Sequence, residues 1–317
     1  MGNKLVSVFH VEDVHRGHAN LKPVAGDPLD IYLLAAVLAT KSFAAQGWSL
    51  SIITNAADRI NARLGALLPP DHGMSIIGRD FSLDVPKNIS FRGSHFKLDL
   101  LTDLGAGVFG DPIGFIDVDV VAVAPIRIPQ LDDTQVLMCD VTQRPQLAEA
   151  SNAIVRDIAR LGGGSVVKPR WFGGEFVYGS AAAFRRLADI TAAMWPRYKA
   201  QIGEIHNTSD EMLLNTAVQG SFGLRPVDSA AAGVLQRWWS VRSDTQGVSF
   251  AEARKCSILH LPADKEFLAA HALRPFDADA FLADYTRRAS RKLLVRRIYN
   301  GIAPLIGKQR RFVARMR

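Results

Sequence analysis

Two aspartates, Asp117 and Asp119, interrupt an otherwise apolar stretch, GFIDVDVVAV at residues 114–123. A buried strand normally excludes carboxylates, because an unpaired buried charge is very costly. Their spacing of two places both side chains on the same face of a strand. If the strand frays at this point, both carboxylates converge, and two convergent oxygen ligands suit a hard divalent cation that offsets the charge of a diphosphate. The alternative is that the acids cap a turn or pair with Arg or Lys at a strand end.

The segments around this stretch alternate between strand and helix patterns. Strands are predicted at 4–11, 48–55, 114–123, 134–141, 170–180 (with a Gly-Gly turn) and 256–262, and helices at 29–46, 57–68, 95–105, 181–201 and 209–220. The alternation predicts βαβ units, and therefore an α/β fold with a mainly parallel, Rossmann-like central sheet flanked by helices. Strand ends carry the ligand chemistry in such a sheet, which favours a functional role for the aspartates.

The aspartate stretch resembles the DxD strand of GT-A glycosyltransferases, which hold a nucleotide sugar through Mn²⁺ or Mg²⁺. HFKLDLLTDLG at 95–105 resembles the helix that precedes this strand in the retaining, glycogenin-like and galactosyltransferase-like members. The resemblance implies that Asp117 and Asp119 hold the cation and that Lys97 helps to hold the donor. An ordinary solvated lysine is the alternative for Lys97.

Two later segments resemble the blood-group type glycosyltransferases. RWFGGEFVYGSAAAFRRL at 170–187 resembles their acceptor-side strand, and SDEMLLN at 209–215 resembles an Asp-Glu-x-x-Leu-Asn segment. The resemblance implies that Asp210 touches the sugar and that Glu211 faces the anomeric carbon, with retention of its configuration. The alternative is that both acids favour the dipole of a helix N-capped by Ser209.

The segment ILHLPADK at 258–265 resembles the C-terminal His segment that completes the metal site in many of these enzymes. His260 is then the third metal ligand, and Lys265 reaches the diphosphate. This sequence departs from the glycogenin-like pattern: His and Lys are five residues apart instead of six, and a Gly is missing. The segment FHVED at 9–13 follows the first strand, where the uridine pocket lies in the family.

The resemblance covers about residues 4–265 and implies a GT-A-like catalytic domain at residues 1–284. The resemblance further implies that this domain transfers a sugar from a nucleoside diphosphate sugar, a UDP-sugar, to a glycan or lipid-linked acceptor hydroxyl. One alternative is a haloacid-dehalogenase-like phosphatase with Asp117 as nucleophile and Asp119 as general acid. That motif normally lies on the first strand of its domain, whereas two βα units precede it here. A non-enzymatic membrane-binding or nucleic-acid-binding module is the other alternative.

The composition is that of a globular protein: 48% of the 317 residues are hydrophobic, 22% are charged, and the mean hydropathy is +0.06. Two cysteines, Cys139 and Cys256, cannot form a disulfide framework, and there is no CxxC motif or Cys/His cluster for zinc. The start of the chain does not resemble a secretory signal. The longest apolar segment, 31–39, is about half of what a bilayer requires. We therefore expect a cytoplasmic protein.

The positive net charge of +7 is concentrated at the C-terminus. Residues 285–317 contain 11 Lys and Arg and no acid, which leaves 27 basic and 31 acidic residues in the remainder, a net charge of −4. Leu294, Ile298 and Ile302 form an apolar stripe in this tail. A basic amphipathic tail predicts peripheral contact with an anionic membrane surface at the cytoplasmic face. The alternative is that the stripe packs on the body. No specific nucleic-acid binding is expected, because the tail lacks a helix-turn-helix or aromatic stacking pattern.

Overall fold

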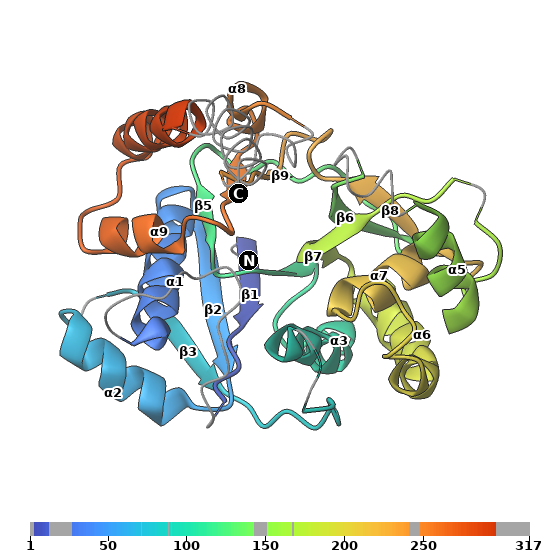
Figure 1. Ribbon diagram of the computed structural model, residues 1–317. Coiled ribbons are helices and arrows are strands. Elements are labelled where there is room, and N and C mark those ends of the chain that lie inside the picture. The colour runs from blue at the N-terminus through green and yellow to red at the C-terminus, as the bar shows by residue number, and fades with distance from the viewer. Residues whose placement is uncertain are drawn as a thin grey trace, which may run out of the picture.

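The computed structural model describes residues 3–12, 27–70, 72–87, 89, 91–142, 151–166, 168–240 and 248–295. The fold is a mixed α/β arrangement of two sheets flanked by helices (Figure 1). The predicted fold class is confirmed, with a mostly parallel central sheet.

The main sheet has seven strands in the order β3-β2-β1-β4-β7-β6-β8. β7 is antiparallel to both of its neighbours, and the other pairings are parallel. The strands are β1 (Asn3–Val8), β2 (Trp48–Thr54), β3 (Ser75–Gly78), β4 (Ile113–Ile116), β6 (Gln135–Asp140), β7 (Phe172–Gly179) and β8 (Arg225–Asp228).

A second sheet has three strands in the order β5-β10-β9. They are β5 (Val120–Ala122), β9 (Leu235–Arg237) and β10 (Ile258–His260). β10 is antiparallel to β5 and parallel to β9. This small sheet carries His260 at the end of one strand and Arg237 at the end of another.

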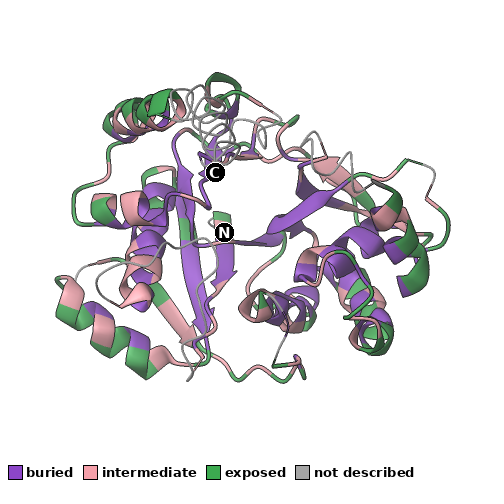
Figure 2. Ribbon diagram, in the orientation of Figure 1, coloured by how far each residue is buried: buried purple, intermediate pink, exposed green. Residues whose placement is uncertain are grey.

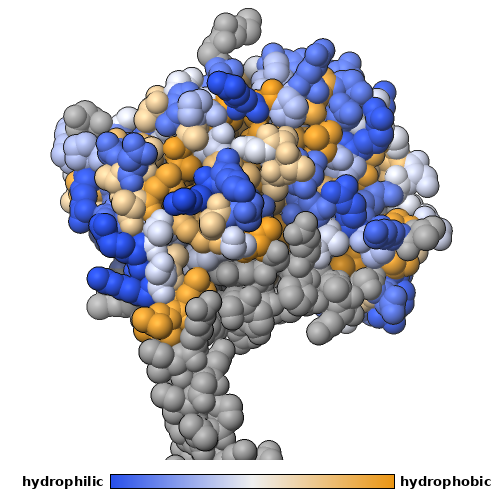
Figure 3. All heavy atoms as spheres, turned by 90° about the horizontal axis from the view of Figure 1, so that it is seen from above, coloured by the Kyte–Doolittle hydropathy of each residue, from blue (hydrophilic) through white to orange (hydrophobic). Residues whose placement is uncertain are grey.

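Helices cover both sides of the main sheet (Figure 1). Those that the structure describes with bounds are α1 (Pro28–Ala45), α2 (Ala57–Leu67), η1 (Arg92–His95, a 3-10 turn), α3 (Phe96–Gly105), α5 (Ser151–Leu161), α6 (Ala181–Ala200), α7 (Asp210–Gln219), α8 (Phe250–Ala253) and α9 (Lys265–Ala272). Figure 2 shows that the central strands are mostly buried, whereas the helices expose their outer faces. Seen from above, hydrophobic residues lie in separate groups among hydrophilic ones (Figure 3).

Helix α1 owes its apolar composition to its place against the sheets. Asp27 caps its N-terminus by accepting a hydrogen bond from the Leu29 backbone N–H at 2.9 Å, and Pro28 occupies the first helical position. Within the described residues, α1 is the one helix long and apolar enough to cross a membrane, with a mean hydropathy of 1.3. More than half of it is buried between α9 and strands β2 and β5, as a core helix would be.

The stretch 114–123 is two strands and not the single strand that its apolar run predicts. The chain ends β4 at Ile116 and begins β5 at Val120, so it passes from the main sheet into the small sheet between them. The Asp117 backbone N–H still bonds to the Glu175 carbonyl of β7 at 2.8 Å, while the Asp119 carbonyl already accepts from Leu261 N–H at 3.0 Å. Both aspartates therefore lie in the crossing between the sheets. A run of apolar residues could not reveal this crossing, because both strands are buried.

The predicted Gly-Gly turn in 170–180 is not a chain reversal: β7 extends through Gly173 and Gly174, but its pairing with β6 is irregular there, since Met138 lies opposite Val177 and Cys139 opposite Gly173. The two glycines do not form a turn; they leave room for neighbouring side chains to pack against the backbone. A Cβ atom on Gly174 would lie 2.6 Å from Asp210 Oδ2, and one on Gly173 would lie closer still to the side chains of Glu175 and Arg237. Glycine is thus required here because carboxylates pack directly against the backbone.

Part of the predicted tail belongs to a helix that packs on the body. Residues 278–295 are helical, so the predicted boundary between Asp284 and Tyr285 lies inside this helix. Tyr285 is fully buried and donates a hydrogen bond to Asp264 Oδ2 at 2.8 Å. Arg288 and Lys292 pair with the other oxygen of Asp264, so these two cations are engaged by the body. Leu294 is exposed, whereas Ile298, Ile302 and the rest of 296–317 lie outside the described residues.

A chain ending at Asp284 is expected to melt roughly 5–15 °C below the full chain, whereas one ending at Val295 is expected to melt within about 3 °C of it. The shorter chain loses the buried Tyr285 ring and leaves Asp264 without its cations. Differential scanning calorimetry of the three lengths measures this. Equal melting of both shortened chains would show that residues 285–295 do not stabilise the body.

Candidate active site

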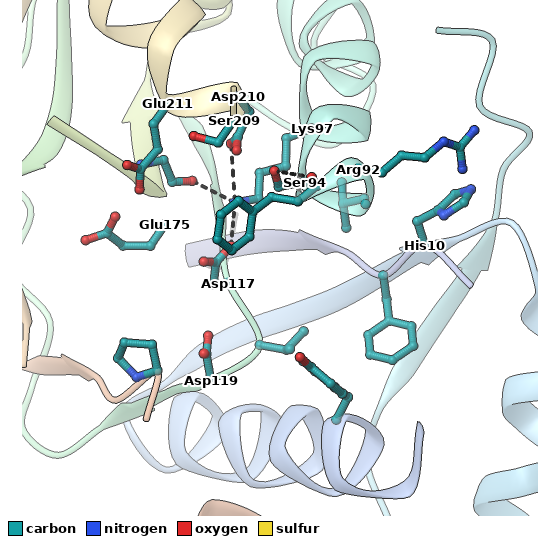
Figure 4. Close-up of a pocket in the computed structure, with 18 of the residues that line it drawn as sticks. His10, Arg92, Ser94, Lys97, Asp117, Asp119, Glu175, Ser209, Asp210 and Glu211 are labelled. Carbon is teal, nitrogen blue, oxygen red and sulfur yellow. Dashed lines mark hydrogen bonds and ion pairs between the residues drawn. The ribbon is translucent and has the colours of Figure 1, made fainter. Parts of the chain in front are cut away.

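A cavity of about 600 Å³ is lined by residues from both sheets, from the helices α1, α2, α3, α7 and α9, and from the turn η1. It brings together all the predicted site residues: Lys97, Asp117, Asp119, Asp210, Glu211, His260 and Lys265. Figure 4 shows Lys97 between Asp117 and Asp210, with Glu175 and Glu211 to one side and His10 and Arg92 to the other. Residues 141 positions apart in the sequence, such as Asp119 and His260, are thus in contact.

Asp117, Asp119 and His260 form a set of three ligand atoms suited to a divalent cation. Their ligand atoms lie within 4.8 Å of one another, and Asp119 and His260 are buried. His260 Nε2 is 3.1 Å from Asp119 Oδ1 and 3.8 Å from Asp117 Oδ2. Two ligands at right angles on Mg²⁺, each bonded at about 2.1 Å, are about 3.0 Å apart, so the three side chains fit such an ion with small adjustments.

Each aspartate uses its remaining oxygen to bind a lysine. Lys97 Nζ lies 2.5 Å from Asp117 Oδ1, and Lys265 Nζ lies 2.6 Å from Asp119 Oδ2. Lys97 also donates to the Gly174 carbonyl at 2.9 Å, and Lys265 donates to the Pro262 carbonyl at 2.8 Å. The lysines therefore turn the free oxygens of the two aspartates toward His260. Neither lysine is the solvated surface residue that the alternative reading of Lys97 assumed, because both are buried.

The charges in this group perturb its pKa values strongly. Burial alone would raise the pKa of Asp119, but Lys265 and His260 outweigh it and hold that pKa well below 3.8. Burial lowers the pKa of His260, and the carboxylates of Asp119 and Glu175 overcome this effect and raise it to about 9. Without a cation, His260 is thus an imidazolium paired with Asp119 near neutral pH.

Cation binding is expected to release one proton from His260, since a metal ligand must be the neutral imidazole. Below the raised pKa of about 9, the proton competes with the cation, so the apparent Mn²⁺ affinity should rise about tenfold from pH 7 to pH 8 and level off above pH 9. Titration calorimetry in two buffers with different ionisation enthalpies counts the proton. The His260→Gln protein should bind more weakly and without this pH dependence. A wild-type affinity that does not change between pH 7 and pH 8 would contradict ligation by His260.

Asp210 lies on the opposite side of Lys97 from Asp117. It is almost fully buried, and its Oδ2 atom has no hydrogen-bond partner among the described residues, although Lys97 Nζ lies 3.6 Å away. Burial raises the pKa of this carboxyl to about 6, against the opposing effect of Lys97. A buried polar atom without a partner that lines a cavity is suited to accept a hydrogen bond from a ligand hydroxyl.

Glu211 presents a carboxylate whose two oxygens are both held. Trp171 Nε1 donates to Oε2 at 2.9 Å, and the Gly174 backbone N–H donates to Oε1 at 3.2 Å. Burial raises the pKa of Glu211, but the Arg237 guanidinium outweighs this effect and keeps the pKa below 4.5. The side chain is therefore an ionised carboxylate that lines the cavity. The side chain of Ser209 at the N-cap of α7 makes no capping bond, and its hydroxyl instead donates to Asn207 Oδ1 at 2.7 Å.

The other end of the cavity is formed by residues that follow β1. His10 stacks on Phe96 with ring centroids 3.9 Å apart, and Glu12 pairs with Arg92 at 3.0 Å. The Asn55 side chain makes hydrogen bonds of 2.8 and 2.9 Å to the backbone N–H and carbonyl of Val11, which fixes this segment. Residues 9–12 of the predicted uridine segment thus line the cavity, whereas residue 13 lies outside the described residues.

Glu175 and Arg237 are site residues that the sequence did not identify. Both side chains are buried and pair with each other. The one available signal was a charged residue in a buried apolar strand, Glu175 within FGGEFVYG. Arg237 lies in a three-residue strand that no sequence pattern indicated.

The comparisons with known proteins point to one fold. The sequence matches no protein-family profile and no curated protein sequence. Among solved structures, the galactosyltransferase LgtC in complex with donor and acceptor sugar analogues is similar to 84% of this chain over 95% of its own, with 12% identity and a TM-score of 0.52. An active-site mutant of LgtC gives the same coverage and TM-score with 14% identity.

A third structure, the bifunctional glycosyltransferase WbbM, reaches a TM-score of 0.49 with 12% identity, over 82% of this chain and 45% of its own. The two LgtC structures establish the fold: the protein has the mixed α/β architecture of GT-A glycosyltransferases. At this identity they establish the fold alone, so the chemistry must be argued from the cavity.

Proposed function

We propose that the protein is a glycosyltransferase that moves a sugar from a nucleoside diphosphate sugar, a UDP-sugar, to a hydroxyl of a glycan or lipid-linked acceptor. The observation that carries the proposal is the cluster of Asp117 Oδ2, Asp119 Oδ1 and His260 Nε2 at the crossing between the sheets. In a GT-A fold, such a cluster lies in the cavity that must hold the donor.

Asp117, Asp119 and His260 would hold Mn²⁺ or Mg²⁺. The ion, when bound, supplies a positive charge that stabilises the leaving diphosphate. Lys97 and Lys265 orient the two aspartates and add positive charge near the donor phosphates. His10 and the fixed backbone of Val11 offer a stacking and hydrogen-bonding surface for the base.

Asp210 and Glu211 lie on the first turn of α7, where both line the cavity beside the cation cluster. The unpartnered Oδ2 atom of Asp210 would accept a hydrogen bond from a sugar hydroxyl. The ionised carboxylate of Glu211 would face the anomeric carbon and stabilise positive charge that develops there. This placement favours retention of the anomeric configuration.

Membrane contact through the tail receives no support from the described residues, because Arg288 and Lys292 are paired with Asp264. Contact through residues 296–317, like the cytoplasmic location, stays a prediction. Co-sedimentation with anionic vesicles, comparing the full chain with one ending at Val295, tests it.

The proposed function is tested by incubating the protein with a panel of UDP-sugars and Mn²⁺ and measuring UDP. We expect UDP release that stops with EDTA and increases with a suitable acceptor. The phosphatase alternative predicts instead the release of inorganic phosphate from phosphate monoesters and stabilisation by beryllofluoride. A binding module would show neither activity. Phosphate release without UDP release would overturn the proposal.

A further inference from the structure

Arg237 joins two carboxylates from two different elements in the wall of the cavity, which all three residues line. Its Nε atom donates to Glu175 Oε1 of β7 at 2.9 Å, and its Nη2 atom contacts Glu175 Oε2. The same Nη2 atom lies 2.5 Å from Glu211 Oε1 of α7. The guanidinium side chain is only 8% exposed, and the Glu175 side chain is fully buried.

This arrangement is costly to build, so stability alone does not explain it. Burying three charges requires their desolvation, and apolar residues of similar size often give an equal or more stable protein. The contacts of Arg237 are also those expected of a residue that positions another side chain. The two oxygens of Glu175 bind Nε and Nη2 of the guanidinium, and the same Nη2 atom also reaches Glu211. A planar guanidinium can bridge two carboxylates in this way, whereas a lysine ammonium cannot reproduce the fork.

Glu211 is thereby held from three directions. Arg237 and the Gly174 N–H bind Oε1, while Trp171 Nε1 binds Oε2. Arg237 comes from the small sheet, and Gly174 and Trp171 come from β7 and the segment before it. The carboxylate is therefore held by groups from both sheets, whereas α7 itself packs mainly on β7 and β8 of the main sheet.

We propose that Arg237, anchored by Glu175, is a positioning residue that fixes the orientation of the Glu211 carboxylate toward the cavity. The proposal rests on the proposed function, in which Glu211 faces the anomeric carbon. Arg237 itself acts through Glu211 and not on the sugar.

Glu175 also lies between the Arg237–Glu211 pair and the cation cluster of Asp117, Asp119 and His260. Its Oε1 atom lies 3.8 Å from His260 Nδ1, which is beyond hydrogen-bond distance, and Nδ1 has no hydrogen-bond partner among the described residues. The two groups therefore interact through charge alone. A carboxylate that hydrogen-bonds a ligating histidine typically contributes about 10- to 100-fold in metal affinity, so the longer contact predicts the lower end of that range. Glu175 thus lies next to both His260 and Arg237, whereas Arg237 pairs with Glu175 and Glu211. The two residues should differ in what their substitution changes.

The test compares Arg237→Lys, Glu175→Gln, Glu211→Gln and the double variant Arg237→Lys/Glu211→Gln. Arg225→Lys is the matched control, because Arg225 pairs with Asp132 at the surface. We measure kcat and KM for UDP release from the best UDP-sugar with Mn²⁺, and Mn²⁺ affinity by calorimetry.

Arg237→Lys should lower kcat about 10²-fold with KM and Mn²⁺ affinity nearly unchanged, as a misplacement of about 1 Å can do. Glu175→Gln should lower kcat and also weaken Mn²⁺ binding about 10-fold or more.

The double variant decides whether Arg237 acts through Glu211. If it does, adding Arg237→Lys to Glu211→Gln should lower kcat by less than about threefold further, since the carboxylate it positions is already lost. Full additivity of the two effects would overturn the proposal. If Glu211→Gln alone leaves kcat unchanged, the proposed role of Glu211 fails instead.

A crystal structure of the Arg237→Lys protein provides a test that needs no donor. The Glu211 carboxylate should leave Trp171 Nε1 or rotate about its side-chain bonds. An unchanged Glu211 would overturn the positioning role. If Arg237→Lys does not fold, the neutral pair Glu175→Gln/Arg237→Gln replaces it, because that pair leaves no unpartnered charge between the two positions. The same displacement of Glu211 is then expected.

Discussion

Replacing Asp119 with asparagine is expected to lower cation-dependent release of UDP from a UDP-sugar by about 10³-fold or more. The cation supplies several kcal/mol of charge stabilisation at the leaving diphosphate. Each loss of about 1.36 kcal/mol slows the reaction about tenfold. Asparagine keeps the size of Asp119 but removes the anionic oxygen that faces His260 Nε2. Steady-state assays across Mn²⁺ concentrations measure the loss.

Asp133→Asn, a change at an exposed acid of the turn before β6, is the control and should keep wild-type rates. If the Asp119→Asn protein reacts at a rate within a few-fold of the wild type, the reaction does not depend on a cation held by Asp119.

The substitution must be asparagine and not alanine, because the Asp119 side chain is buried and pairs with its neighbours. It is 5% exposed and pairs with both Lys265 and His260. Asparagine loses the charge but keeps an oxygen that accepts a hydrogen bond from Lys265 or His260, whereas alanine leaves both cations with neither charge nor acceptor, at a cost of about 3–5 kcal/mol of folding stability. An inactive alanine variant could therefore reflect unfolding alone.

Glu211→Gln is expected to lower kcat by about 10²- to 10³-fold with donor affinity changed by less than about threefold. Glutamine is nearly isosteric, so it retains the contacts that fill the space. It lacks the negative charge that would act on the anomeric carbon only as positive charge develops there. Single-turnover rates, together with donor affinity from calorimetry, separate the two effects.

Asp279→Asn is the control for this experiment, since Asp279 is an exposed acid in the first turn of the helix of residues 278–295. If Glu211→Gln abolishes donor binding while bound donor reacts at the normal rate, Glu211 is a binding residue. If neither quantity changes, the Glu211 carboxylate only stabilises the N-terminus of α7 through the helix dipole.

Local patterns in the sequence predicted most elements of the first half well. The helices at 57–68 and 95–105 lie within one residue of α2 and α3, and the strand at 48–55 within one residue of β2. These elements show clear periodicity, and the two helices end at Gly105 and before Pro69. In that half, Asp117 and Asp119 stand out as charges in an apolar segment, whereas Lys97 was indicated by the resemblance of its helix to the family.

The parts that could not be predicted depend on long-range contacts. The crossing at 117–119 arises because β5 pairs with β10, more than 130 residues later in the chain. Glycines 173 and 174 indicated a turn, whereas their role depends on Asp210, Glu175 and Arg237 packing against them. The partners of Arg237 likewise come from two other elements. No local pattern contains this information.

Binding of UDP with and without a divalent cation tests the central claim most directly. Titration calorimetry is performed with UDP alone, with UDP and Mn²⁺, and with UDP, Mn²⁺ and EDTA, on the wild-type and Asp119→Asn proteins. We expect wild-type UDP affinity to increase at least about tenfold with Mn²⁺, and the increase to vanish with EDTA and in Asp119→Asn. Wild-type UDP binding that is equally tight in all three conditions, or absent in all three, would contradict a cation-held nucleoside diphosphate in this cavity.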